Sequence, residues 1–224
     1  PPTAAPRKEA PAAPAVAIPS GTATLKRPDG TVEATYHYRL VEPPAAAIAD
    51  GKKVPLVVFL HGAGERGDDN AAQLVHFVRT AAGAEFQAKN PCFVLAMQCP
   101  KGESWAPIDI EGIRSRNETP KFAAEPTRAM RAVMAAMDEV LATRPVDRAR
   151  IYLTGLSMGG FGSFDLAVRR PELFAAVVPI CGGGDPATAP KVASIPFYIV
   201  HGDDDPVVPT RLSRTMRDAI AAAQ

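Results

Sequence analysis

The chain has 224 residues, of which 46% are hydrophobic and 22% are charged, a composition typical of an ordinary globular domain. Its formal net charge is +1, so nothing in the composition indicates binding to nucleic acid or to an anionic membrane surface. No apolar run reaches the roughly 18 residues that a membrane-spanning helix needs.

The first 20 residues are almost entirely proline and alanine, without helical or strand periodicity. Such a segment buries too little apolar surface to offset its loss of conformational entropy. We therefore predict a disordered linker over 1–20 and a folded domain over 21–224. A Pro/Ala tract ahead of a domain often follows a removed export signal, so we expect a secreted or periplasmic protein. The chain starts without methionine and stops within a helical pattern, and we expect it to be a fragment.

The remaining sequence alternates between strand and helix patterns. A Pro-Asp-Gly turn at 28–30 predicts a hairpin at the start of the domain, and the apolar, β-branched run at 54–60 is typical of a buried parallel strand. The pattern predicts an α/β fold with a mostly parallel, doubly wound sheet covered by helices and an N-terminal antiparallel hairpin. The expected strands are 22–26, 31–40, 54–60, 93–97, 150–154, 175–180 and 195–200; the expected helices are 71–82, 125–143, 158–170 and 211–223, with a surface loop at 101–124.

The sequence Gly155-Leu-Ser157-Met-Gly159 lies between a predicted strand and a predicted helix. This is the setting of a nucleophile elbow, in which a strained turn projects the serine hydroxyl above the sheet edge. Glycine is expected two residues before and two after the serine because a side chain at either place would collide with neighbouring backbone. We predict that Ser157 is a nucleophile rather than part of a simple glycine-rich turn.

A second glycine-rich segment, 60–67, directly follows the buried strand 54–60. In folds that have a nucleophile elbow, the loop at this place supplies one backbone N–H of the oxyanion hole, and the residue after the nucleophile supplies the other. We expect these donors to be Ala63 and Met158. Each must point at the oxygen that becomes negative in the tetrahedral intermediate.

The charged and titratable residues of this segment have two interpretations each. His61 precedes the nucleophile in the chain, whereas the base of such a fold follows it, so a structural role bonded to the loop backbone is favoured. Glu65 and Arg66 form either a solvated pair or part of the pocket mouth, and we favour a local structural role.

Trp105, in the loop 101–124, is either a wall for an aromatic acyl group or a packed anchor of the loop.

A third segment, 201–209, follows the predicted strand 195–200 and contains Asp203, Asp204 and Asp205. Its position puts these carboxylates at the same sheet edge as Ser157, where an acid is needed to orient a catalytic histidine. Three adjacent carboxylates in a loop are often only solvated, so this pattern alone does not select one. His201 precedes them, against the chain order of the fold, and we expect it to be structural.

Taken together, the segments 60–70, 98–100 with nearby Trp105, 151–160, 171–174 and 201–209 resemble one group of α/β-hydrolase serine esterases. The group comprises polyhydroxybutyrate-depolymerase-like and feruloyl-esterase-like carboxylesterases, with relatives labelled predicted peptidase or phospholipase/carboxylesterase. The resemblance implies that the acid is Asp205, with Asp204 second. It also implies a histidine some tens of residues later, but none of the four histidines follows Asp205. We expect this histidine, and the last strand that carries its loop, to lie beyond Gln224.

These observations predict a serine carboxylesterase that acts on small or polymeric esters through an acyl-enzyme on Ser157, and that is inactive as this fragment. Two alternatives remain: a serine peptidase of the prolyl-oligopeptidase type, and a catalytically silent hydrolase fold used for binding. No cofactor is expected, since neither a metal-ligand cluster nor a phosphate-binding loop is recognisable. The three cysteines are interpreted as small buried residues rather than disulfide partners.

Overall fold

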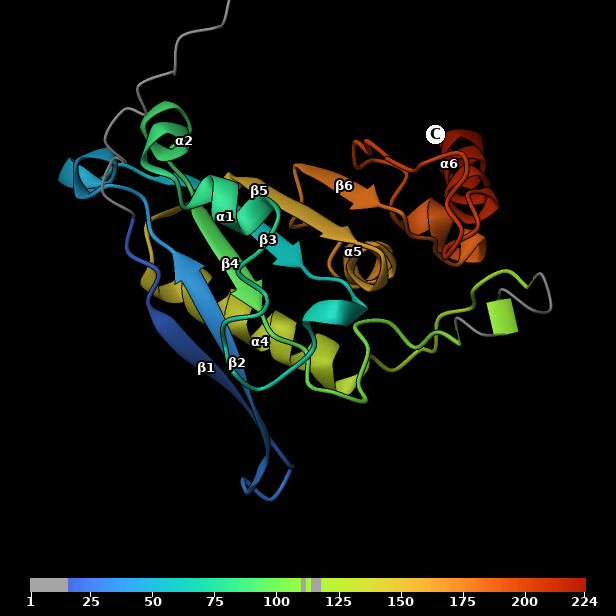
Figure 1. Ribbon diagram of the computed structural model, residues 1–224, viewed down its shortest axis with the longest axis horizontal. Helices are drawn as coiled ribbons and strands as arrows, with labels where there is room; N and C mark the ends of the chain where they lie inside the picture. The colour runs from blue at the N-terminus through green and yellow to red at the C-terminus, as the bar shows by residue number, and fades with distance from the viewer. Residues whose placement is uncertain (1–15, 110–111, 114–117) are drawn as a thin grey trace, which may run out of the picture.

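The computed structural model describes residues 16–109, 112–113 and 118–224. Six strands form one sheet in the order β1-β2-β4-β3-β5-β6 (Figure 1). The first three strands in this order pair antiparallel, and β4, β3, β5 and β6 are parallel. The strands are β1 Ser20–Lys26, β2 Val32–Val41, β3 Val54–Leu60, β4 Phe93–Met97, β5 Val146–Leu156 and β6 Ala176–Ile180. The predicted mostly parallel sheet with an N-terminal antiparallel hairpin is therefore confirmed.

Helices cover both faces of this sheet. Alternate residues of the central strand β3 face opposite sides: Leu56, Val58 and Leu60 belong to the apolar core formed with α4 and α5, while Phe59 packs with α1 and α2. Figure 1 shows α6 and the C-terminus at the side of the molecule beyond β6. The helices are α1 Phe77–Ala81, α2 Ala84–Lys89, α4 Arg128–Thr143, α5 Met158–Arg169 and α6 Arg211–Ala223; short 3-10 turns are η1 Ala45–Ala47, η2 Ala49–Gly51, η3 Ala63–Glu65 and η4 Pro186–Lys191.

The predicted helix over 71–82 is wrong in its first half, because α1 begins only at Phe77. The carboxylate of Asp69 accepts the backbone N–H groups of Ala71 (2.9 Å) and Ala72 (3.0 Å), which closes a turn in place of a helix. His76 then has φ 51°, a left-handed conformation that interrupts helical hydrogen bonding. Apolar spacing alone did not reveal this side-chain competition with the backbone.

The predicted strand at 195–200 lies parallel to β6 but forms only two isolated bridges, Val177 with Phe197 and Ile180 with Val200. Each partner segment contains a proline, Pro179 or Pro196, and proline has no N–H to donate to a continuous ladder. The segment still brings the loop after Val200 to the carboxyl edge of the parallel strands.

The predicted linker 1–20 falls mostly on residues 1–15, which lie outside the described residues. Val16 and Ile18 pack against the apolar cluster beneath α1 and α2, and the N–H of Leu40 donates to the carbonyl of Pro19 at 3.0 Å. Across the described part of the chain, every helix is too short or too polar to cross a lipid bilayer.

Candidate active site

Ser157 occupies the single residue between β5 and α5 and has φ 54° and ψ −114°. A non-glycine residue at this φ is strained, and such strain persists only where the surrounding structure enforces it. Here the backbone N–H of Ser157 donates to the carbonyl of Ile180 on β6 at 2.8 Å. The turn is thus held by the neighbouring strand, and the serine lies at the carboxyl edge of the sheet and at the N-terminus of α5.

The glycines on either side of this turn allow a close approach to β3. A Cβ on Gly155 would lie 2.5 Å from the carbonyl oxygen of Gly159 and 2.7 Å from that of Leu60, and a Cβ on Gly159 would overlap the Leu60 carbonyl. The predicted requirement for glycine two residues before and two after Ser157 is confirmed at both positions. The close contact fixes the start of α5 against the end of β3.

The segment after β3 reaches the same place. Gly62 precedes η3, and Ala63 and Met158 line one pocket of about 240 Å³ together with Ser157. Met158 is the first residue of α5, and N–H groups in the first turn of a helix have no partner within the helix. The two expected oxyanion donors therefore border the space above the serine.

His61 has no exposed surface, and both of its ring nitrogens are hydrogen bonded. Nε2 accepts the N–H of Cys99 at 2.9 Å, so Nδ1 carries the proton and donates to the carbonyl of Gly62 at 2.6 Å. Burial lowers the pKa of the imidazole, which favours the neutral ring. The predicted structural role of His61 is confirmed: it fastens the loop after β3 to the loop after β4.

Trp105 is a packed anchor of its loop and not a pocket wall. Its side chain is fully buried, its Nε1–H donates to the carbonyl of His61 at 3.0 Å, and its ring meets the His61 ring edge-on with the centroids 5.1 Å apart. The indole therefore supports the same loop from the other side.

The three aspartates after Val200 have different surroundings. Asp203 is exposed and pairs with Arg214 at 2.7 Å, and Asp204 is exposed. Asp205 is half-buried, and its Oδ1 accepts the N–H groups of Val207 (2.8 Å) and Val208 (2.9 Å). The N–H of Val208, followed by that of Val207, lowers the pKa of this carboxyl. Since Val207 and Val208 line the pocket of Ser157, Asp205 is the aspartate tied to that pocket.

The residues behind Asp205 were not recognised from the sequence as part of this site. The sulfur of Cys181 lies within 4.8 Å of the Asp205 carboxylate and helps to lower the pKa of that carboxyl, and His201 Nε2 lies 3.5 Å from Asp205 Oδ2. Cys181 directly follows β6, and this position at the carboxyl edge of the sheet was the available signal. Desolvation raises the pKa of the thiol, so Cys181 is a neutral thiol here rather than a thiolate.

Cys181, His201 and Asp205 have their ligand atoms within 4.8 Å of one another, a donor set that zinc can use. The geometry does not fit a metal ion, because His201 has no free ring nitrogen. Its Nε2–H donates to the carbonyl of Val208 at 2.9 Å, and its Nδ1 is hydrogen bonded to Ser213 Oγ at 2.7 Å. These bonds confirm the structural role predicted for His201.

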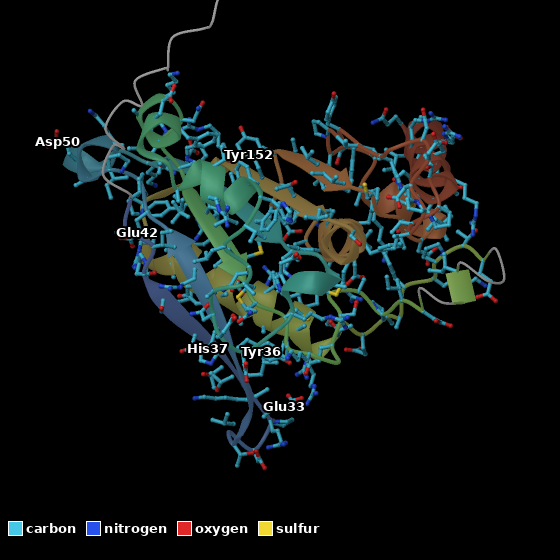
Figure 2. The ribbon with its side chains drawn as sticks, in the orientation of Figure 1. Glu33, Tyr36, His37, Glu42, Asp50 and Tyr152 are labelled. Atoms are coloured by element: carbon cyan, nitrogen blue, oxygen red, sulfur yellow. The ribbon has the colours of Figure 1, made fainter. Side chains whose placement is uncertain are left out.

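No histidine is hydrogen bonded to the Ser157 hydroxyl within the described residues, which include all four histidines of the sequence. His61 and His201 are used structurally, and His76 is exposed with Nε2 4.0 Å from Glu65 Oε1. His37 lies on β2, and Figure 2 places it on the hairpin side of the sheet, away from α5. The described residues thus bring together the expected nucleophile, oxyanion donors and acid.

A family model described as Phospholipase/Carboxylesterase matches residues 43–224. The chain is 29% identical to the "Putative esterase NocK" of Nocardia uniformis subsp. tsuyamanensis over 222 residues, covering 93% of this chain and 59% of that protein. The crystal structure of a thermostable esterase superposes with a TM-score of 0.76 at 38% identity, covering 92% of this chain and 52% of that one. A CE1 ferulic acid esterase of Anaeromyces mucronatus has a TM-score of 0.63 at 13% identity, covering 97% and 83%, and shares the fold. The chain thus spans between half and two thirds of the length of the first two.

Proposed function

Because the chain belongs to the phospholipase/carboxylesterase family, which has the α/β-hydrolase fold, we propose that it hydrolyses carboxylic esters through an acyl-enzyme on Ser157. One observation carries the proposal. Ser157 has φ 54° at the β5–α5 turn and shares its pocket with the two residues expected to form the oxyanion hole, Ala63 and Met158. A strained serine beside two backbone donors is the arrangement that acyl transfer requires.

In the proposed first step, a base takes the proton of Ser157 Oγ while the oxygen attacks the ester carbonyl. The carbonyl oxygen becomes negative and accepts the N–H groups of Ala63 and Met158, and the positive end of α5 adds to this stabilisation. Collapse of the intermediate expels the alcohol, which receives the proton from the base, and leaves an acyl-serine. Water then repeats the sequence, releasing the acid and restoring the hydroxyl.

Asp205 is the proposed acid of this mechanism. Its role is to hold the base in the correct tautomer and to stabilise it once protonated. Its carboxylate suits that role because the backbone N–H groups of Val208 and Val207 keep its pKa low, so it is ionised at neutral pH. The thiol of Cys181 and the ring of His201 support it from behind.

The base is a histidine that we place beyond Gln224, since the two buried histidines have both ring nitrogens hydrogen bonded. A serine without a base is a poor nucleophile. We therefore expect the 224-residue chain to be inactive and the full-length protein to be active on esters. Export to the periplasm or the medium remains a prediction from the Pro/Ala-rich start of the chain.

The proposal is tested by hydrolysis of p-nitrophenyl butyrate by the 224-residue chain and by the full-length protein, each with and without Ser157→Ala. Full-length activity that Ser157→Ala abolishes supports the mechanism. If a fluorophosphonate does not label Ser157 in the full-length protein, and the full-length protein does not hydrolyse the ester, the mechanism is overturned and a silent binding fold is favoured. If the full-length protein cleaves the p-nitroanilide of an N-acylated amino acid faster than it cleaves the ester, the site is assigned to a peptidase instead.

A further inference from the structure

Among the described residues that line the pocket above Ser157, Arg66 has the one charged side chain. Ile108, Phe161 and Val208 contribute apolar side chains to the same lining, and Ser104 contributes a hydroxyl. The pocket volume of about 240 Å³ is below the roughly 300–1,000 Å³ of sites that hold drug-sized ligands. A small substrate that has both a polar group and an apolar part matches this lining and volume.

The guanidinium of Arg66 is held in place by two backbone carbonyls. Nε donates to the carbonyl of Ala63 at 3.0 Å, and Nη1 donates to the carbonyl of Glu103 at 3.2 Å. An arginine has five N–H donors, so one on Nη1 and both on Nη2 remain for a ligand. Arg66 is thus oriented without being saturated, and its free edge can form the paired hydrogen bonds that a carboxylate accepts.

The positive charge of Arg66 has no carboxylate partner among the described residues. The side chain of Glu103 turns away, accepting Tyr36 OH at 2.8 Å and Arg128 Nη2 at 2.9 Å. Asp205, the acid nearest the pocket wall, uses Oδ1 for backbone N–H groups, and its carboxylate also contacts Cys181. An uncompensated cation beside a nucleophile raises the local concentration of anionic substrates and orients them.

We propose that Arg66 is a specificity-determining residue that binds a free carboxylate on the substrate, so that the preferred esters are half-esters of short dicarboxylic acids, such as succinate and glutarate. This inference rests on the proposed ester hydrolysis at Ser157. The short methylene chain lies against Ile108, Phe161 and Val208, and its far carboxylate pairs with Arg66. Because the carboxylate pairs with Arg66 equally in the ground state and the transition state, the preference appears mainly in KM.

The test compares two p-nitrophenyl esters with the same glutaryl chain on the full-length protein: mono-p-nitrophenyl glutarate, which is anionic, and its neutral methyl ester. The measured quantity is the ratio of their kcat/KM values. We expect Arg66→Gln to lower this ratio at least tenfold, mainly through KM, and Arg66→Lys to retain a larger part of it because the charge remains. Lys101→Gln, which removes an exposed cation outside the pocket lining, is the matched control and leaves the ratio unchanged.

The outcomes separate this inference from the proposed function. If the neutral ester is hydrolysed and Arg66→Gln leaves the ratio unchanged, the role of Arg66 is refuted while the esterase proposal stands. If neither ester is hydrolysed, calorimetry with monomethyl glutarate decides: binding that Arg66→Gln weakens at least tenfold supports the anion site, and equal binding overturns it. Circular dichroism of each variant confirms that the comparison is between folded proteins.

Discussion

Replacing His61 by alanine tests whether this histidine is structural or catalytic. In the unsubstituted protein, the ring of His61 accepts the N–H of Cys99 at 2.9 Å and donates to the carbonyl of Gly62 at 2.6 Å. The change leaves both of these buried backbone groups without a partner. An unsatisfied buried group costs about 1–3 kcal/mol, and the lost ring contact with Trp105 adds to this. We expect His61→Ala to lower the free energy of unfolding by about 3–5 kcal/mol.

The measurement is urea unfolding followed by circular dichroism, with His76→Ala as the matched control. His76 is exposed, so its replacement shifts the unfolding free energy by less than about 0.5 kcal/mol. Activity of His61→Ala falls as well, because the loop that carries Ala63 loses its attachment. If His61→Ala unfolds at the same urea concentration as the parent yet loses all ester hydrolysis, the structural assignment is wrong and His61 belongs to the chemistry.

The same ring has a pH signature whose sign follows from its burial. Desolvation lowers the pKa of His61 in the folded state below the ordinary 6.5, so below that pH the unfolded chain binds more protons than the folded chain. The stability contributed by the neutral ring is present above pH 6.5 and is lost as the pH falls through the folded pKa. His61→Gln, which does not titrate, should reduce the loss of stability between about pH 7.5 and about pH 5.

Three further substitutions test the serine turn, the proposed acid and the exposed edge beside β6. Gly159→Ala drives a methyl group into the carbonyl of Leu60, and we expect a loss of at least about 3 kcal/mol in urea unfolding, whereas Gly64→Ala, where no atom lies within 4 Å, stays within about 1 kcal/mol. In the full-length protein, Asp205→Asn should lower kcat for p-nitrophenyl butyrate by about 10⁴ with little effect on KM; a loss below tenfold excludes it as the acid. Tyr198 is 73% exposed beside β6, and Tyr198→Lys should reduce light scattering on heating if this edge drives association, with an unchanged onset arguing against it.

The fold was largely predictable because its signals are local. The strand 93–97, the strand 54–60 and the helix 211–223 have the predicted bounds. The resemblance to α/β-hydrolase esterases, stated from motif order, is confirmed by the family match over residues 43–224 and by the thermostable esterase structure. These features depend on hydrophobic periodicity and turn chemistry, which a single sequence records.

The features that sequence reasoning missed depend on contacts between distant segments. The sequence favours a local structural role for Arg66, since it does not show that this side chain also donates to the carbonyl of Glu103, 37 positions away. Cys181 was interpreted only as a small buried residue, whereas its thiol meets Asp205 through the pairing of β6 with the segment 195–200. The turn at 71–76 was missed because a single carboxylate, Asp69, outweighs the apolar spacing.

The left-handed backbone at Ser157 also has a consequence for how the sequence can change. A serine at φ 54° has a conformational cost of the order of 1 kcal/mol that a glycine would avoid. Replacement by glycine therefore relaxes the turn at the same moment that it removes the hydroxyl. Selection for thermal stability alone would favour glycine at this position, and only selection for catalytic turnover would keep the serine. Stability and activity are thus opposed at this one residue.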